Sequence, residues 1–267
     1  MATRKDVQIG KHTVGENHDC FVIAEIGHNH QGQLDLAKKL FQAASFCGAQ
    51  AVKMQKRDNK ALFTQSMFDS PYDNENSYGA TYGEHREYLE FGAIEFMELK
   101  QWAEELDLIM FATPFDLPSV DFLERIDLPL YKIASCDLTN IPLLRHVART
   151  GKPMLVSTGG GSMEDVVLAY ETIMPINPNF CLLQCTSAYP TPPEELNLRV
   201  IETYRERFPD IPIGISDHQN GIAMALVAYM LGARVVEKHF TLDRSMRGTD
   251  HAFSLEPNGM RRLVRDL

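Results

Sequence analysis

Short β-branched stretches alternate with helix-like amphipathic stretches along almost the whole chain, and this alternation limits the possible folds more than any other feature. The strand candidates are residues 21–27, 51–55, 109–115, 131–135, 153–158, 180–186, 212–217 and 235–241. Strands separated by helices imply right-handed crossovers and a parallel sheet. Eight such units in about 250 residues predict a closed (β/α)8 TIM barrel. A doubly wound sheet would carry a Gly-x-Gly-x-x-Gly turn after its first strand, and the sequence has none there.

Two segments depart from the repeat. Residues 8–19 alternate around turn signals, and we predict a short hairpin that plugs the floor of the barrel. Residues 56–92 form a long, polar and aromatic-rich connection, a length that is usually functional or disordered in a compact domain. We interpret it as a lid over the barrel mouth; the alternative is a surface insertion that packs only on its own helix. We therefore expect an N-terminal hairpin or cap in residues 1–20 and one catalytic barrel in residues 21–267.

Charge and hydropathy exclude several classes of partner. The net charge is −10 and no long basic stretch is present, which argues against DNA or RNA binding. No apolar run approaches the ~20 residues that cross a bilayer. The first residues are polar and contain no apolar segment of the kind found in secretory signals. The five cysteines are scattered without a C-x-x-C pair, so we expect free thiols in a cytoplasmic protein.

Charged residues occupy the later halves of the predicted strands, namely Glu25, Lys53, Lys132, Glu237 and His239. Barrel interiors are normally filled with Val, Ile and Leu, and charged residues are rarely buried without partners. One explanation is a ring of structural ion pairs. Because the carboxyl ends of barrel strands carry the active sites of barrel enzymes, the position favours a catalytic role.

Two histidines stand at the ends of neighbouring predicted strands. His218 follows the seventh strand and His239 lies in the eighth, so their strands are ~4.8 Å apart and both imidazoles can reach one ion. Two protein ligands leave positions open for water and substrate, as in catalytic metal sites. A shell of nitrogen and oxygen suits Mn²⁺, Fe²⁺, Co²⁺ or Zn²⁺. His28 and His30, after the first strand, are a rival pair.

A pocket for a small anion is also predicted. Two lysines end strands, and hydroxyl residues stand at similar heights on four others: Lys53, Lys132, Thr113, Ser135, Ser157 and Ser216. The sequence STGGGSMED (157–165) places a glycine turn before a helix that Ser162 and Asp165 open as a capping box. Backbone N–H groups at such a turn can hold a phosphate. The alternative is that these hydroxyl groups only cap helices.

Eight motifs in order carry a family resemblance: AEIGHNHQG, AVKMQ, ATPF, YKIAS, STGG, QCTSAYPTP, GISDH and EKHFT. They resemble the successive strand-end signatures of the sialic acid synthase family over roughly residues 8–267, and are similar, more distantly, to synthases of legionaminic and pseudaminic acids. The resemblance implies condensation of phosphoenolpyruvate with an open-chain N-acetylmannosamine-like sugar and water. The expected products are a sialic-acid-type nonulosonate and phosphate.

The resemblance also implies roles for individual residues. His218 and His239 would hold the metal, usually Mn²⁺, with Mg²⁺, Co²⁺ or Zn²⁺ as alternatives. Glu25, Asp137 and Asp250 would be catalytic. The substrate-binding set would be Lys53, Gln55, Thr113, Lys132, Ser135, Ser157, Ser187, Tyr189 and Ser216. The family also implies a homodimer and a C-terminal antifreeze-like domain, and we expect no such domain within these 267 residues.

Three other functions are compatible with parts of the pattern. A deoxy-octulosonate or deoxy-heptulosonate phosphate synthase would accept arabinose 5-phosphate or a related sugar phosphate. A metal-dependent sugar isomerase would need no phosphate pocket, so Lys53 and Lys132 would have no role in its reaction. A non-catalytic protein that binds the sugar or phosphoenolpyruvate would release no phosphate.

Overall fold

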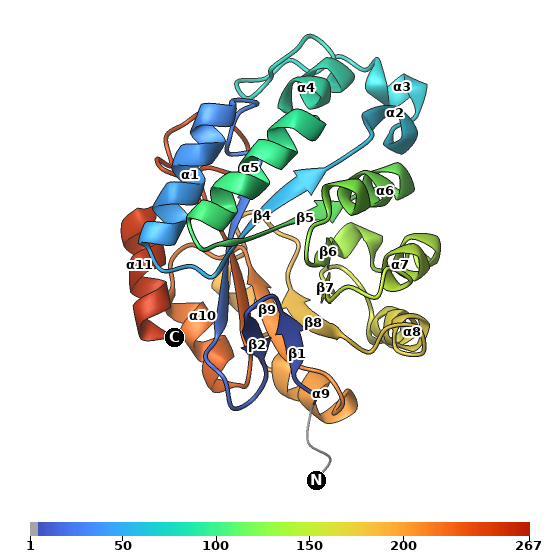
Figure 1. The fold of residues 1–267 in the computed structure, drawn as a ribbon, viewed down its shortest axis with the longest axis vertical. Coiled ribbons are helices and arrows are strands. Elements are labelled where there is room, and N and C mark those ends of the chain that lie inside the picture. Colours follow the sequence, from blue (N-terminus) through green and yellow to red (C-terminus); the bar gives the residue numbers. More distant parts are fainter. Residues whose placement is uncertain (1–4) are drawn as a thin grey trace.

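The computed structural model describes residues 5–267 and confirms the (β/α)8 barrel (Figure 1). The strands pair in parallel around a closed ring, in the order β10-β3-β4-β5-β6-β7-β8-β9. They are β3 (Phe21–Gly27), β4 (Ala51–Lys56), β5 (Ile109–Pro114), β6 (Tyr131–Ile133), β7 (Met154–Ser157), β8 (Phe180–Cys185), β9 (Ile213–Asp217) and β10 (Val235–His239). The predicted strand ranges are therefore confirmed to within two residues at each end.

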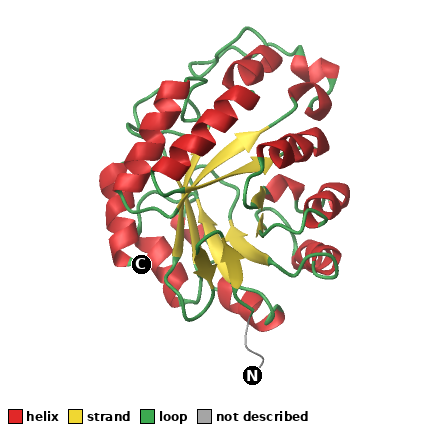
Figure 2. Cartoon of the chain, in the orientation of Figure 1, coloured by secondary structure: helices red, strands yellow, loops and turns green. Residues whose placement is uncertain are grey.

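An outer layer of helices surrounds the strands (Figure 2). The helices are α1 (Leu34–Phe46), α2 (Asn59–Leu62), α3 (Gln65–Phe68), α4 (Tyr82–Leu89), α5 (Ala93–Glu105), α6 (Leu117–Ile126), α7 (Ile141–Ala148), α8 (Met163–Ile173), α9 (Val200–Arg207), α10 (Ala223–Met230) and α11 (Pro257–Asp266). Two short 3₁₀ helices, Ser135–Asp137 and Pro193–Glu195, follow β6 and β8. None of the helices between residues 5 and 267 combines the length and the apolar character that a membrane span needs.

The predicted hairpin closes one end of the barrel. Strands β1 (Val7–Ile9) and β2 (His12–Val14) pair antiparallel, and Val7, Ile9 and Val14 are buried. These three side chains form one apolar cluster with inward-facing residues of the barrel strands, such as Phe111 and Leu183. The hairpin thus excludes water from the amino-terminal half of the barrel interior, as we predicted.

Along each strand, every second residue faces the barrel interior, because successive side chains point to opposite faces. On β3, Phe21 and Ile23 join the apolar cluster under the hairpin, whereas Glu25 lines a cavity. On β7, Leu155 belongs to the cluster and Ser157 lines the cavity. The interior therefore has an apolar half beside the hairpin and a polar half at the carboxyl ends of the strands.

The segment 56–92 folds into helices α2, α3 and α4 beyond the carboxyl end of β4 (Figure 1). Its aromatic rings stack on one another; Tyr78 and Tyr88 are parallel, with ring centroids 4.9 Å apart. The Tyr78 hydroxyl donates a hydrogen bond to the Arg247 carbonyl, which ties the segment to the loop after β10. Arg57 and Arg86 from this segment line the central cavity, so it packs on more than its own helix. These contacts support the interpretation as a lid.

Candidate active site

A cavity of about 550 Å³ occupies the polar half of the barrel interior. It opens at the carboxyl ends of the strands, where barrel enzymes carry their active sites. Its lining includes most of the predicted site residues, namely Glu25, Lys53, Gln55, Thr113, Lys132, Ser135, Ser157, Ser187, Tyr189, Ser216, His218, His239 and Asp250. The structure therefore gathers in one place residues that lie more than 200 positions apart in the sequence.

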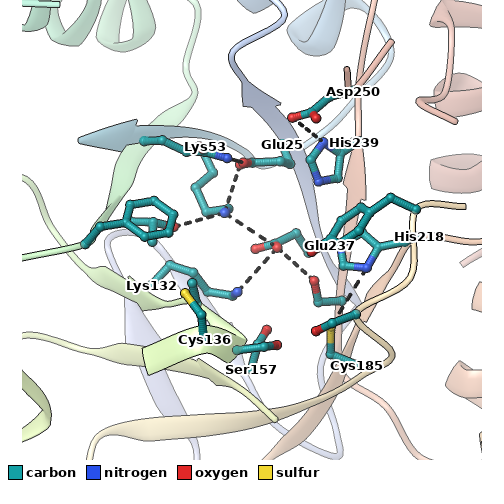
Figure 3. A pocket seen from close by; sticks show the side chains of 18 of the residues that line it. Glu25, Lys53, Lys132, Cys136, Ser157, Cys185, His218, Glu237, His239 and Asp250 are labelled. Carbon is teal, nitrogen blue, oxygen red and sulfur yellow. Dashed lines mark hydrogen bonds and ion pairs between the residues drawn. The ribbon is translucent and has the colours of Figure 1, made fainter. Parts of the chain in front are cut away.

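Glu237 lies at the centre of the ion pairs in this cavity (Figure 3). Its Oε1 is 3.6 Å from Nζ of Lys53 and 3.5 Å from Nζ of Lys132. The Ser216 hydroxyl donates a hydrogen bond to the same oxygen at 3.0 Å. Sequence analysis named Glu237 as a buried charge and gave it no role in the site. The alternation of inward-facing residues on β10 could have assigned it, because Glu237 stands two residues before His239.

The two lysines differ in how far carboxylates compensate their charge. Burial lowers the pKa of Lys132, and Glu237 offsets this only in part. Burial also acts on Lys53, but Glu237 and Glu25 outweigh it and raise the pKa of Lys53 above its ordinary value. Burial would raise the pKa of Glu237, yet Lys132 and Lys53 hold it below the ordinary value. Lys132 is therefore the cation with more to gain from an anionic ligand.

Glu25 is fully buried beside Lys53. Its Oε2 lies 3.0 Å from the Lys53 ammonium, and its Oε1 accepts a hydrogen bond from Gln55 at 2.8 Å. Burial raises the pKa of Glu25, although Lys53 opposes the rise. A carboxyl group with a pKa moved toward neutrality can accept a proton and return it at physiological pH, as a general base must.

Hydroxyl groups line the floor of the cavity near the lysines. The Ser157 hydroxyl is buried and has no hydrogen-bond partner in the described part of the chain, and a ligand oxygen would supply one. The N–H of Gly159 donates to the Ser135 hydroxyl at 2.9 Å. A Cβ atom on Gly159 would lie 2.4 Å from Oγ of Ser187 and 2.8 Å from Oγ of Ser135, so only glycine fits there. Because its N–H is already bonded, Gly159 does not serve as the predicted backbone phosphate donor; it holds a serine instead.

The predicted capping box at the start of α8 is confirmed. The Ser162 hydroxyl accepts a hydrogen bond from the Asp165 N–H, and the Asp165 carboxylate accepts from the Ser162 N–H. These groups satisfy the first turn of the helix and are not part of the cavity lining. Ser162 therefore caps a helix and does not line the anion pocket.

The two predicted metal ligands lie side by side. The ring centroids of His218 and His239 are 5.3 Å apart. Nδ1 of His218 donates to the Thr186 carbonyl at 3.0 Å, which leaves the lone pair on Nε2 free. Burial lowers the pKa of both imidazoles to about 3, so both are neutral at physiological pH. The carboxylate of Asp250 lies 3.7 Å from Nδ1 of His239 (Figure 3).

This pair of residues fits a divalent metal ion. Nδ1 of His239 is buried and accepts or donates no hydrogen bond within residues 5–267, and such an unpartnered nitrogen points to a ligand. Neutral imidazoles with free nitrogens are common ligands of divalent transition metals such as Fe²⁺ and Zn²⁺, and carboxylate or water oxygens suit Mn²⁺. Within residues 5–267, no group of three or more His, Cys, Asp or Glu residues converges to hold an ion without further ligands. Water and substrate oxygens would therefore complete the coordination, as in catalytic sites.

A buried ion pair stands behind the two histidines. Nζ of Lys238 lies 2.9 Å from Oδ2 of Asp217, and both side chains are about 1% exposed. Lys238 also donates to the Gln219 carbonyl. Because Asp217 and Lys238 each directly precede one of the histidines, the pair fixes the strand ends that present them.

The rival histidine pair has other partners. The His30 ring stacks on Phe91 with centroids 4.3 Å apart, and its Nδ1 accepts from the Gly32 N–H. His28 lies between two guanidinium groups: Nη1 of Arg57 is 3.1 Å from its Nε2, and Nη1 of Arg86 is 3.3 Å from its Nδ1. Two neighbouring cations repel a metal ion, so the geometry favours His218 and His239.

One predicted catalytic residue lies outside the cavity lining. Asp137 ends the 3₁₀ helix after β6, where its carboxylate accepts a hydrogen bond from the Asn140 amide at 2.9 Å. Its catalytic role stays a prediction. In contrast, Arg57, Arg86 and Thr249 line the cavity without having been predicted, because no periodic pattern reveals where the lid and the loops place their side chains.

Comparison with known proteins shows which family this chain belongs to. Residues 40–267 match the model of the NeuB family. The chain is 46% identical to human N-acetylneuraminate-9-phosphate synthase over 254 residues, which are 95% of this chain and 71% of the human protein. This chain belongs to the NeuB family. It is 37% identical to the N,N'-diacetyllegionaminic acid synthase of Legionella pneumophila, over 95% of this chain and 72% of that protein.

A solved structure has a very similar fold to this chain. The N-acetylneuraminic acid (sialic acid) synthetase of Leptospira borgpetersenii, in complex with citrate, superposes with a TM-score of 0.89 at 33% sequence identity. The match covers 98% of this chain and 87% of the Leptospira chain. The resemblance that the eight motifs suggest is therefore confirmed, and the relatives are nonulosonate synthases.

Proposed function

We propose that this protein condenses phosphoenolpyruvate with an N-acetylmannosamine-like amino sugar and water, and releases phosphate and a sialic-acid-type nonulosonate. The observation that carries the proposal is the joint presence, in one cavity, of a lysine-rich anion pocket and two free imidazoles. An isomerase would need the imidazoles alone and a simple anion binder the lysines alone. The human and Legionella relatives, which are named as synthases of nonulosonic acids, support the same reaction class.

Phosphoenolpyruvate fits beside Lys53 and Lys132. The Thr113 hydroxyl lies 3.0 Å from the Lys53 ammonium, and the unpartnered Ser157 hydroxyl faces the same space. Two ammonium groups and several hydroxyl donors match the charge and the hydrogen-bond acceptors of a carboxylate and a phosphate. The Ser135 hydroxyl, held by the Gly159 N–H, adds a fixed donor.

We propose His218 and His239 as the ligands of a divalent metal, with Mn²⁺ the first ion to test. When bound, such an ion would act as a Lewis acid on the sugar aldehyde. The enol carbon of phosphoenolpyruvate bonds to the aldehyde carbon, and the electron pair of the aldehyde C=O bond moves to its oxygen. That oxygen becomes a hydroxyl group by taking up the proton that Glu25 removes from the attacking water. The new carbon–carbon bond leaves a cationic centre at the carbon that bears the phosphate ester.

Glu25 is placed to serve the second half of the reaction. Water adds to the cationic centre and loses a proton to the Glu25 carboxylate, whose pKa burial has raised. In the tetrahedral species the added hydroxyl group becomes the ketone, and the carbon–oxygen bond to phosphate breaks with its electron pair passing to the phosphate. The hydroxyl proton leaves with the phosphate. Lys132 and Lys53 stabilise the departing anion through their charge. Gln55 fixes the Glu25 carboxylate for this task through its hydrogen bond to Oε1.

Phosphate release from phosphoenolpyruvate with Mn²⁺ tests the proposal. The panel contains N-acetylmannosamine, its 6-phosphate, a 2,4-diacetamido hexose and arabinose 5-phosphate. We expect release with an amino sugar, and loss of release when His218 or His239 is changed to alanine. Release with arabinose 5-phosphate alone would contradict the proposal and indicate a deoxy-octulosonate phosphate synthase. Binding without release, in a full-length chain, would indicate a non-catalytic binder.

A further inference from the structure

A buried asparagine joins the loop after β3 to the loop after β10, at the place where the first and the last strand of the barrel pair. Asn29 is 1% exposed, and its side-chain amide donates to the Phe240 carbonyl at 2.8 Å and to the Ser254 hydroxyl at 3.0 Å. The Ser254 hydroxyl in turn donates to the Asp250 carbonyl at 2.6 Å. Neither Asn29 nor Ser254 lines the main cavity. Each therefore acts on the site through the residues that it holds.

The first of these hydrogen bonds fixes the peptide that follows His239. The N–H of Phe240 donates to the Glu25 carbonyl at 2.8 Å, and its carbonyl accepts from Asn29, so the end of β3 and the loop after it hold both sides of this residue. On the other side of His239, the buried ion pair of Lys238 fixes the chain. The backbone is thus held before and after His239, and this sets the direction of the imidazole.

The second hydrogen bond fixes the turn that carries Asp250. Ser254 holds this turn twice, because its hydroxyl donates to the Asp250 carbonyl and its N–H donates to the His251 carbonyl at 3.1 Å. The Asp250 carboxylate lies 3.7 Å from Nδ1 of His239. It also lies against the end of β3, since a Cβ atom on Gly27 would be 3.2 Å from Oδ2 of Asp250. A small rotation of the turn would therefore move the carboxylate away from the imidazole.

We propose that Asn29 is a positioning residue of the reaction centre, whose amide holds His239 and Asp250 in one fixed arrangement. It acts on His239 through the Phe240 carbonyl and on Asp250 through the Ser254 hydroxyl. This inference rests on the proposed condensation and its metal ligands. An asparagine amide suits the task because its two N–H groups can hold two acceptors at once. The loss of such an indirect partner of a metal site costs about 10- to 100-fold in metal affinity or activity.

Calorimetric titration of the metal-free protein with Mn²⁺ is the main test, because it needs no turnover. Asn29→Leu keeps the shape of the side chain without its donors, and Mn²⁺ affinity should fall about tenfold. The matched control is Asn177→Leu. Asn177 is 2% exposed and donates to the Lys152 carbonyl at 2.7 Å, just before β7 and so at the opposite end of the barrel. Its variant should lower the melting temperature in the same way and keep Mn²⁺ affinity within twofold.

Ser254→Ala separates the two arms of the network. It removes the hydrogen bond to the Asp250 carbonyl and leaves the one from Asn29 to Phe240. We expect kcat/KM for the amino sugar to fall about tenfold, while Mn²⁺ affinity stays within twofold.

A folded Asn29→Leu protein that binds Mn²⁺ as tightly as the unchanged protein overturns the inference, and so does an equal loss of affinity in Asn177→Leu. If Asn29→Leu does not fold, Ser254→Ala decides, and an unchanged kcat/KM in that variant overturns the inference. If the unchanged protein binds Mn²⁺ but releases no phosphate with any sugar, the proposed condensation fails. The Mn²⁺ titrations then still decide the role of Asn29.

Discussion

The two halves of the barrel interior are built from the same strands and differ in almost every physical property. In the half beside the hairpin, inward-facing residues such as Ile23 and Phe111 are apolar and pack against the plug. Two residues further along the same strands stand Glu25 and Thr113, in a cavity of about 550 Å³. The strand period of two thus divides one interior into a part that stabilises the fold and a part that carries charge.

This contrast explains how the protein maintains four ionisable groups inside a barrel. Burying a charge is costly unless it is paired, and here Glu25, Glu237, Lys53 and Lys132 compensate one another. The apolar half supplies the stability that the charged half lacks. We therefore expect mutations in the two halves to separate activity from stability.

The largest expected effect comes from the charged half. Lys132→Met should lower kcat for phosphate release by about 100- to 1,000-fold, because the lysine stabilises the departing phosphate. Among residues 5–267, Lys132 forms an ion pair with Glu237 alone, and Glu237 keeps Lys53 and the Ser216 hydroxyl as partners, so the protein should still fold. Steady-state phosphate release measures the effect. A fall of less than fivefold would contradict the assignment of Lys132 to the anion pocket.

The next prediction compares two residues of β7, one that faces the apolar half of the barrel interior and one that faces the polar half. Leu155→Ala should lower the free energy of unfolding by about 2–5 kcal/mol, because it opens a cavity in the apolar cluster, and should leave kcat within twofold. Ser157→Ala should lower kcat/KM for phosphoenolpyruvate about tenfold and leave stability unchanged, because its hydroxyl has no partner among the residues that the structure describes. Urea denaturation and steady-state kinetics on both variants measure these effects. A loss of activity in Leu155→Ala with a loss of stability in Ser157→Ala would contradict the prediction.

The buried ion pair between Lys238 and Asp217 leads to a predicted loss of stability that is similar in size to that of Leu155→Ala. Lys238→Met should cost about 3–5 kcal/mol, because it leaves the Asp217 carboxylate buried without its partner. Restoring neutrality with Asp217→Asn in the same protein should recover much of the loss. If the pair also positions His218 and His239, Mn²⁺ affinity measured by calorimetry should fall in the single variant. Equal metal affinity in a folded Lys238→Met protein would limit the pair to a structural role.

The smallest expected effect concerns the rival histidine. His30→Gln should leave Mn²⁺ affinity within twofold, because the His30 ring stacks on Phe91 and its Nδ1 already accepts from a backbone N–H. His239→Ala, measured alongside by calorimetry, should abolish the same binding. A tenfold loss of affinity in His30→Gln would move the metal site to the end of β3.

Sequence alone predicted the fold, and it named most of the residues that the barrel gathers in one cavity, for a physical reason. The strands are strongly patterned, and their period of two sorts Lys53, Lys132 and Ser157 to one face. Residues outside the strands have no such rule: the 3₁₀ turn after β6 directs Asp137 to Asn140, and the lid brings Arg86 onto His28. Glu237 lies on a strand, and yet the sequence did not reveal its role. Its inward-facing position on β10 follows from the strand period, but its ion pairs with Lys53 and Lys132 form only in the closed barrel.

The most direct test of the account is a crystal structure with Mn²⁺ and phosphoenolpyruvate, read from the anomalous signal of manganese and the position of the phosphate. We predict a manganese peak in contact with His218 and His239, and phosphoenolpyruvate beside Lys53 and Lys132. A peak at His28 and His30, or phosphoenolpyruvate bound between Arg57 and Arg86, would contradict the division of the cavity that we describe.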